Sequence, residues 1–176
     1  MCHETYKRNQ NRFIFKIRDI NIKIVLYEYG KYRLCCFFLP SKNKNLQRDF
    51  VWTIEQKREL IWSILIDRFI PNCLILNIID PNDYKKTILQ IIDGKQRLST
   101  MLDFYNNKFT IVIDSVEYYY KDLPHDYQLA IKNYNIKYYI IYETFENKIS
   151  DEDKIKWFKF INFAGTPQDK KHLDEL

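Results

Sequence analysis

Residues 88–100 run Ile-Leu-Gln-Ile-Ile-Asp-Gly-Lys-Gln-Arg-Leu-Ser-Thr, and the expected secondary structure changes within them. Residues 88–92 predict a buried strand, whereas from Leu98 onward the apolar residues follow the spacing of a helix. Asp93 and Gly94 therefore occupy a turn from a strand to a helix. At such a turn the backbone N–H groups and the positive end of the helix point outward, toward any anion that binds there.

The side chains of this turn favour a binding site over a position in a core. Gly94 permits a positive φ and the close approach of a ligand. Lys95 and Arg97 supply charge-assisted donors for phosphate oxygens. Asp93 would orient a water, hold a metal ion or pair with Arg97. The other polar residues of the first helical turns are Gln96, Ser99 and Thr100. The alternative is a capping aspartate followed by solvated basic residues.

The composition is that of one folded domain. Of the 176 residues, 46% are hydrophobic and 16% are aromatic, which excludes disorder along most of the chain. The formal net charge of +5 is compatible with contact to a nucleotide or to nucleic acid, but it is also common in proteins that bind neither.

The cysteines and histidines do not have the spacing of metal ligands. No two of the four cysteines form a C-x-x-C pair and the three histidines lie far apart, so we predict no zinc site. Cys35 and Cys36 lie in an apolar run, which indicates that they are buried residues of a strand in a protein of the reducing cytosol. No apolar segment approaches the about 20 residues of a membrane span, and residues 1–5 lack the core of a signal peptide. We therefore expect a soluble cytoplasmic protein with no membrane partner.

We predict one compact α+β domain over residues 12–176, preceded by a loose polar segment at 1–11. Apolar patterning predicts strands at 12–17, 22–27, 33–39, 73–79, 88–92, 109–113 and 136–142. Helices are expected at about 53–66, after Arg97, at 125–132 and at 151–162, with a polar loop at 40–45. Thr53 and Gln56 have the spacing of a capping box. The inward residues of that helix would be Ile54, Leu60, Ile61, Ile64 and Leu65.

Two further segments are candidate walls of a ligand pocket. Arg48 would hold a phosphate or pair with Asp93, and Trp52 would wall a nucleotide pocket. The alternative for these two residues is a surface arginine and a core tryptophan. Near the end of the last helix, the residues that would close over a ligand are Asn162, Gly165 and Thr166. An ordinary helix end followed by a turn is the favoured interpretation of that segment.

Taken in order, these motifs resemble a known family. The chain has Gln-Arg-x-Phe-Val-Trp at 47–52, Ser-Ile-Leu at 63–65, Ile-Pro at 70–71 and Ile-Asp-Gly-x-Gln-Arg-Leu-Ser-Thr at 92–100. Asn-x-x-Gly-Thr-Pro follows at 162–167. From about residue 46 to the terminus, this order resembles the N-terminal domain of GmrSD-type modification-dependent restriction enzymes.

The resemblance implies a ParB/sulfiredoxin-like α+β fold, with a mixed sheet and flanking helices, that binds and hydrolyses a nucleoside triphosphate with Mg²⁺. Such systems include phosphorothioate-sensing proteins. In them this domain is the sensing or gating part of the restriction system, and a separate HNH-type nuclease domain cuts DNA. Carried over by position, Asp93, Gln96 and Arg97 would be catalytic. The nucleotide-binding residues would be Arg48, Gly94, Arg97, Ser99 and Thr100, together with Lys95, whose charge suits phosphate oxygens. The setting implied is a bacterial cell, or one infected by a phage.

The chain departs from the family pattern at named positions. Lys95 stands where the family usually has glutamine, which changes the local charge while still allowing contact to phosphate. Asp49 occupies a position that is often proline. His3, His125 and His172 form no H-N-H constellation, so we expect no DNA cleavage by this chain alone.

A second hypothesis belongs to another class. The chain would be a DNA-binding or regulatory module without turnover, which acts on a partner nuclease or interferes with a defence protein. Lys95 and the net charge of +5 are compatible with it. Salt-dependent DNA binding that survives removal of nucleotide would separate this hypothesis from the first.

Overall fold

The computed structural model describes residues 13–21, 35–36, 38–39, 44–45, 51–80 and 83–164. In chain order the elements are β1 (Ile14–Asn21), β2 (Cys35–Cys36), β3 (Phe38–Leu39), β4 (Lys44–Asn45), α2 (Ile54–Leu65), β5 (Cys73–Ile79), β6 (Thr87–Asp93), α3 (Lys95–Tyr105), β7 (Ile111–Ile113), β8 (Val116–Tyr118), the 3-10 helix η2 (Tyr120–Asp122), α4 (His125–Asn133), β9 (Asn135–Tyr142) and α5 (Asp151–Ala164).

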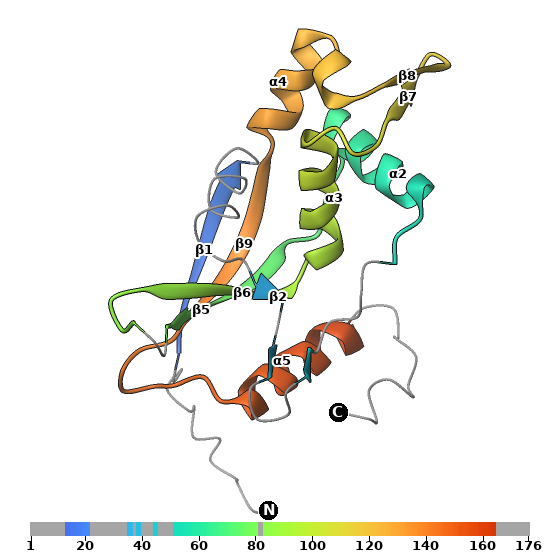
Figure 1. The fold of residues 1–176 in the computed structure, drawn as a ribbon. Helices are drawn as coiled ribbons and strands as arrows, with labels where there is room; N and C mark the ends of the chain where they lie inside the picture. Colours follow the sequence, from blue (N-terminus) through green and yellow to red (C-terminus); the bar gives the residue numbers. More distant parts are fainter. Residues whose placement is uncertain are drawn as a thin grey trace, which may run out of the picture.

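Five of the described strands form one mixed sheet in the order β1-β9-β5-β6-β2. β9 is parallel to β5 and β2 is parallel to β6, while the other two neighbouring pairs are antiparallel. The late strand β9 thus lies between the first strand and β5 (Figure 1). The predicted α+β class with flanking helices is confirmed, and the ParB/sulfiredoxin-like topology stays a prediction.

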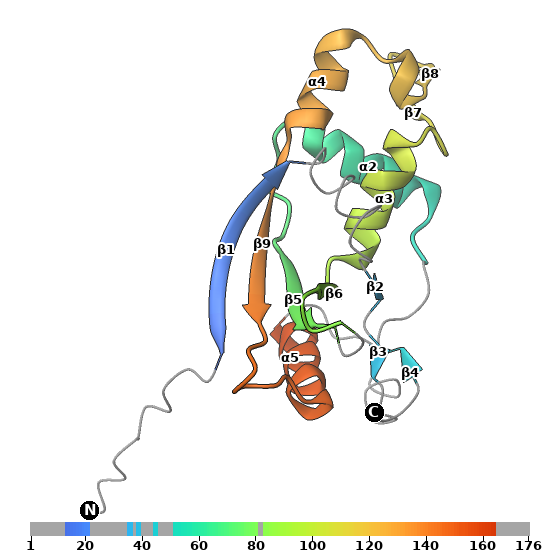
Figure 2. The same ribbon diagram turned by 60° about the vertical axis from the view of Figure 1, so that its left-hand side comes forward.

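The two faces of the sheet carry separate apolar clusters, because successive side chains of a strand point to opposite faces. On one face α2, α3 and α4 pack on the sheet, and the most buried contributors include Ile61, Ile75, Ile91, Leu98 and Phe104. On the other face α5 covers a smaller cluster made by Leu76, Ile92, Ile141, Ile149 and Phe158. Figures 1 and 2 show α5 lying at the end of the sheet away from α4.

The first long helix begins as its sequence predicts. Thr53 Oγ1 accepts a hydrogen bond from the Gln56 backbone N at 3.3 Å, and Gln56 Oε1 accepts one from the Thr53 backbone N at 2.9 Å. This confirms the capping box. Leu60, Ile61 and Ile64 are buried as predicted, with Leu65 packed against them.

The prediction that Ile54 faces inward is wrong, because this side chain is 38% exposed. The first turn of α2 lies at the end of the helix that is farther from the sheet (Figure 1).

Several predicted boundaries are also corrected. The strand expected at 12–17 continues to Asn21, because all eight residues of β1 pair with β9. Within the loop expected at 40–45, Lys44 and Asn45 form β4 and pair with β3. The expected segment 1–11 and the expected strand 22–27 lie outside the described residues, and the domain boundary predicted at 12 is not tested.

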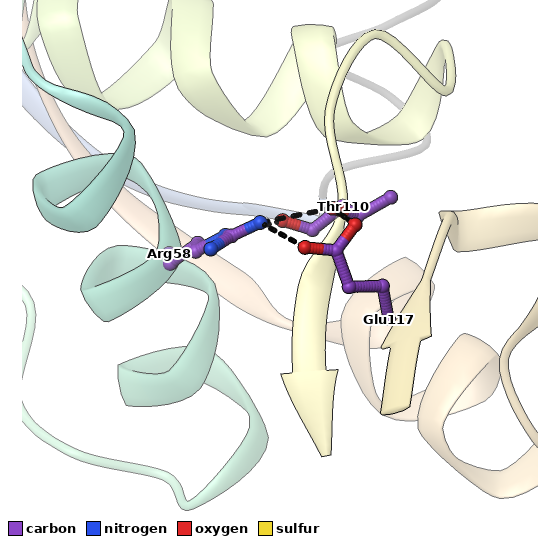
Figure 3. Close-up of polar contacts among 3 residues, drawn as sticks. All are labelled: Arg58, Thr110 and Glu117. Atoms are coloured by element: carbon purple, nitrogen blue, oxygen red, sulfur yellow. Dashed lines mark hydrogen bonds and ion pairs between the residues drawn. The ribbon is translucent and has the colours of Figure 1, made fainter. Parts of the chain in front are cut away.

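The strand predicted at 109–113 is shorter than expected and belongs to a hairpin. β7 pairs with β8 across Asp114 and Ser115, whose φ values are 49° and 66°. Figure 3 shows how α2 holds this hairpin. Arg58 donates to the Thr110 carbonyl at 2.9 Å, to Thr110 Oγ1 at 3.1 Å and to Glu117 Oε1 at 3.0 Å. Thr110 Oγ1 in turn donates to Glu117 Oε2 at 3.0 Å.

Candidate functional site

The predicted turn is present between β6 and α3. Asp93 is the last residue of β6, Gly94 is the N-cap of α3, and Lys95 is the first helical residue. Gly94 has a φ of 102°, in the left-handed region that favours glycine. A Cβ at this position would collide with Sγ of Cys73 and lie 3.0 Å from its Cβ. Both the backbone conformation and the space therefore require glycine.

Cys73 is a structural support beneath this turn. Its side chain is buried, and burial raises the pKa of the thiol to about 11 in spite of the positive charge of Arg97. The thiol is consequently protonated at neutral pH, and it is not suited to act as a nucleophile or as a metal ligand.

Arg97 folds back over the turn that precedes it. Its Nη2 donates to Asp93 Oδ2 at 2.7 Å and to the carbonyl oxygen of Asn72 at 3.1 Å. The Arg97 side chain is only 16% exposed, against 37% for Asp93. The buried Nε of Arg97 has no hydrogen-bond partner among the described residues. Asp93 thus holds Arg97 in place, one of the roles that the sequence suggested for it.

The pKa of Arg97 reflects two opposing effects. Burial lowers the pKa of the guanidinium, but Asp93 and Cys73 together outweigh this effect and raise it above its ordinary value. Arg97 is therefore a fixed positive charge in a partly buried position.

The start of α3 concentrates positive charge. Gly94 provides no side-chain cap, and the first turn contains Lys95 and Arg97 but no acidic residue. The helix dipole adds its positive end at the same place. Asp93 offsets part of this positive charge through its ion pair with Arg97, and a bound anion would add to that compensation.

Gln96 connects this turn with the segment that precedes α2. Its Oε1 accepts a hydrogen bond from the Val51 backbone N at 3.2 Å. The next residue, Trp52, is partly buried and packs against the larger apolar cluster. Trp52 is thus part of the core, which was one of its two predicted roles. It also lines a cavity, as its other predicted role requires.

A surface cavity of about 400 Å³ lies beside Arg97. Its walls include Trp52, Gln56, Glu59, Ser63, Phe69 and Arg97. The structure therefore brings together Trp52 and Arg97, which are far apart in the sequence. Gln56, Glu59, Ser63 and Phe69 were missed by the sequence analysis, as were Asn72 and Cys73. Gln56, Glu59 and Ser63 are three and four residues apart, a spacing that could have placed them on one face of α2.

The remaining predicted site residues are located differently. Ser99 is partly buried, and Thr100 is fully buried, with no hydrogen-bond partner for its Oγ1 among the described residues. A phosphate would reach Thr100 only after the core had opened. Asn162 lies near the end of α5, which packs on the opposite face of the sheet from α3. Arg48, Gly165 and Thr166 lie outside the described residues, as does the side chain of Asn162.

Comparison with known proteins identifies the family. The model of the GmrSD restriction endonuclease N-terminal domain matches residues 26–173. The chain belongs to this family. The GmrSD N-terminal domain is a part of restriction systems, and the matched region includes the whole turn and the cavity beside it. No curated protein and no solved structure gave a significant match.

Two negative findings concern the described part of this GmrSD N-terminal domain. No helix there is both long enough and apolar enough to cross a membrane. The same part contains no group of three or more His, Cys, Asp or Glu side chains that could hold a metal ion.

Proposed function

We propose that the domain binds a nucleoside triphosphate at the turn formed by residues 93–97 and hydrolyses it. The observation that carries this proposal is the charge at the start of α3, where Lys95 and Arg97 lie behind a glycine N-cap with no acid in the first turn. Backbone N–H groups, the helix dipole and two cations together favour a ligand with several negative charges. The family, which belongs to restriction systems, provides the context.

Each residue of the turn has a role in this proposal. Lys95 and Arg97 contact phosphate oxygens, and Gly94 allows the ligand to approach the backbone. The Asp93 carboxylate orients a water and accepts its proton as the water oxygen attacks the terminal phosphorus. The bond from that phosphorus to the bridging oxygen breaks, and a nucleoside diphosphate and inorganic phosphate leave. Gln96 keeps the segment around Val51 next to the turn, where the terminal phosphate would lie.

Magnesium is compatible with this turn. Mg²⁺ binds through one or two carboxylates together with substrate phosphates, and it neutralises phosphate charge. Asp93 is partly exposed, and only its Oδ2 is engaged by Arg97. Asp93 is therefore the residue that would hold the ion.

The proposal is tested by titrating ATP, GTP, CTP and UTP with and without Mg²⁺. We expect Arg97→Ala to weaken binding by about 10–100-fold, the effect of a lost charge-assisted hydrogen bond. Asp93→Asn should reduce turnover by about 100-fold or more, because a positioned acid–base group is lost, and should weaken binding in the presence of Mg²⁺ more than binding without it. Arg18→Ala, which changes an exposed arginine on β1, is the matched control.

Two outcomes would contradict the proposal: no binding by the unaltered protein, or equal binding by Arg97→Ala and the unaltered protein with both folded. Nucleotide-independent, salt-sensitive binding to DNA would instead support the DNA-binding or regulatory module that acts on a partner nuclease or defence protein.

A further inference from the structure

The cavity beside Arg97 has two kinds of wall. Trp52 and Phe69 supply aromatic surface, and Phe69 is 85% exposed. Gln56, Glu59 and Ser63 come from one face of α2 and supply polar groups. An aromatic surface beside amide, carboxylate and hydroxyl groups suits a flat polar ring, because the ring stacks on its faces and forms hydrogen bonds at its edges.

The size of the cavity agrees with a small-molecule site. Its volume is about 400 Å³, within the range of about 300–1,000 Å³ that is typical of ligand pockets. Glu59 forms an ion pair with Arg68 at 3.0 Å, and both side chains are largely exposed, so this pair is weak and a ligand could replace it at small cost.

Arg97 connects the cavity with the turn formed by residues 93–97. It lines the cavity and also pairs with Asp93 at 2.7 Å. A group in the cavity and an anion at the start of α3 would therefore contact the same guanidinium. One ligand with a flat polar ring at one end and phosphates at the other would satisfy both parts.

We propose that this cavity holds the nucleoside part of the triphosphate. The base lies against Trp52 and Phe69, the polar face of α2 contacts the edge of the base or the sugar, and the phosphates lie on residues 93–97. This inference rests on the proposed function, because without triphosphate at the turn the cavity has no link to a nucleotide.

The test compares a nucleoside triphosphate with inorganic tripolyphosphate, both with Mg²⁺. Tripolyphosphate has the phosphates but nothing to fill the cavity. We expect the nucleotide to bind about tenfold or more tightly than tripolyphosphate, since stacking and edge contacts add to affinity. Ser63→Leu, which fills the cavity, should remove this advantage while tripolyphosphate binds as before.

Two further substitutions separate stacking from edge contacts. Trp52→Ala should weaken nucleotide binding by about tenfold, whereas Trp52→Phe retains a ring and most of the affinity. Glu59→Gln should change the ranking of the four nucleotides. Glu55→Gln is its matched control, because Glu55 lies on the same helix and is exposed, and is not among the residues that line the cavity. Thermal unfolding of each variant checks that it is folded.

The outcomes distinguish the two proposals. Equal binding of nucleotide and tripolyphosphate, both unaffected by folded Ser63→Leu, would overturn the cavity assignment and leave phosphate binding at the turn intact. Binding of neither compound would overturn both.

Discussion

Gly94 shows how a single residue is constrained from two sides. Its φ of 102° is unfavourable for any residue with a Cβ, and Cys73 occupies the space that a Cβ would need. The sequence indicated that Gly94 permits a positive φ at this turn. It did not predict Cys73, which lies 21 positions earlier and reaches Gly94 only through the pairing of β5 with β6.

We predict that Gly94→Ala lowers the free energy of unfolding by about 2 kcal/mol or more, from left-handed strain and the collision with Cys73. Urea denaturation measures this loss. Cys73→Ala alone should be mildly destabilising, and the double variant should recover part of the loss, because the sulfur no longer collides with the new methyl group. Strictly additive effects in the double variant would show that Cys73 and residue 94 do not interact.

At the scale of elements, local signals predicted the helices well. The capping box of α2 and the boundaries of β5 and α4 agree closely with their sequence patterns, because caps and apolar periods act within one element. The β7–β8 hairpin was missed, since its turn contains Asp114 and Ser115 rather than the usual glycine. Contact with Arg58 on α2 supports that hairpin from another part of the chain.

The Arg58 contacts predict unequal effects at the two ends of the network. Arg58→Ala should cost about 1–2 kcal/mol, because a part-buried carbonyl and hydroxyl of Thr110 lose their donor. Glu117→Ala should cost less than about 1 kcal/mol, because this carboxylate is largely exposed. Chemical denaturation of both single variants and the double variant measures the coupling. A larger loss for Glu117→Ala than for Arg58→Ala would contradict this account.

At the scale of the whole molecule, the sheet separates a large cluster under α2, α3 and α4 from a small one under α5. The candidate turn joins β6 to α3, and its cavity is lined by α2, by residues 69–71 ahead of β5 and by Arg97 of α3; α2 and α3 both pack on the larger cluster. α5 is therefore a cover for the opposite face, and its apolar residues contribute to stability more than to the site.

We predict that Phe158→Ala lowers the free energy of unfolding by about 3–4 kcal/mol, the usual cost of a cavity left by a buried phenylalanine. Unfolding should stay a single transition, because the two clusters share the strands of one sheet. Denaturation followed by tryptophan fluorescence and by circular dichroism would test this. An early separate transition in the Phe158→Ala variant would show instead that α5 unfolds independently.

The sequence by itself determined the α+β class, most helices and several strands, the glycine turn and its charges, because these depend on local periodicity, caps and residue chemistry. Only the tertiary structure decided that β9 lies between β1 and β5 and that Thr100 is buried. It also decided that Arg97 pairs with Asp93 and donates to the carbonyl oxygen of Asn72. It also joined Trp52, the polar face of α2 and Arg97 around one cavity. Such contacts depend on how distant segments pack, and no local pattern encodes that packing.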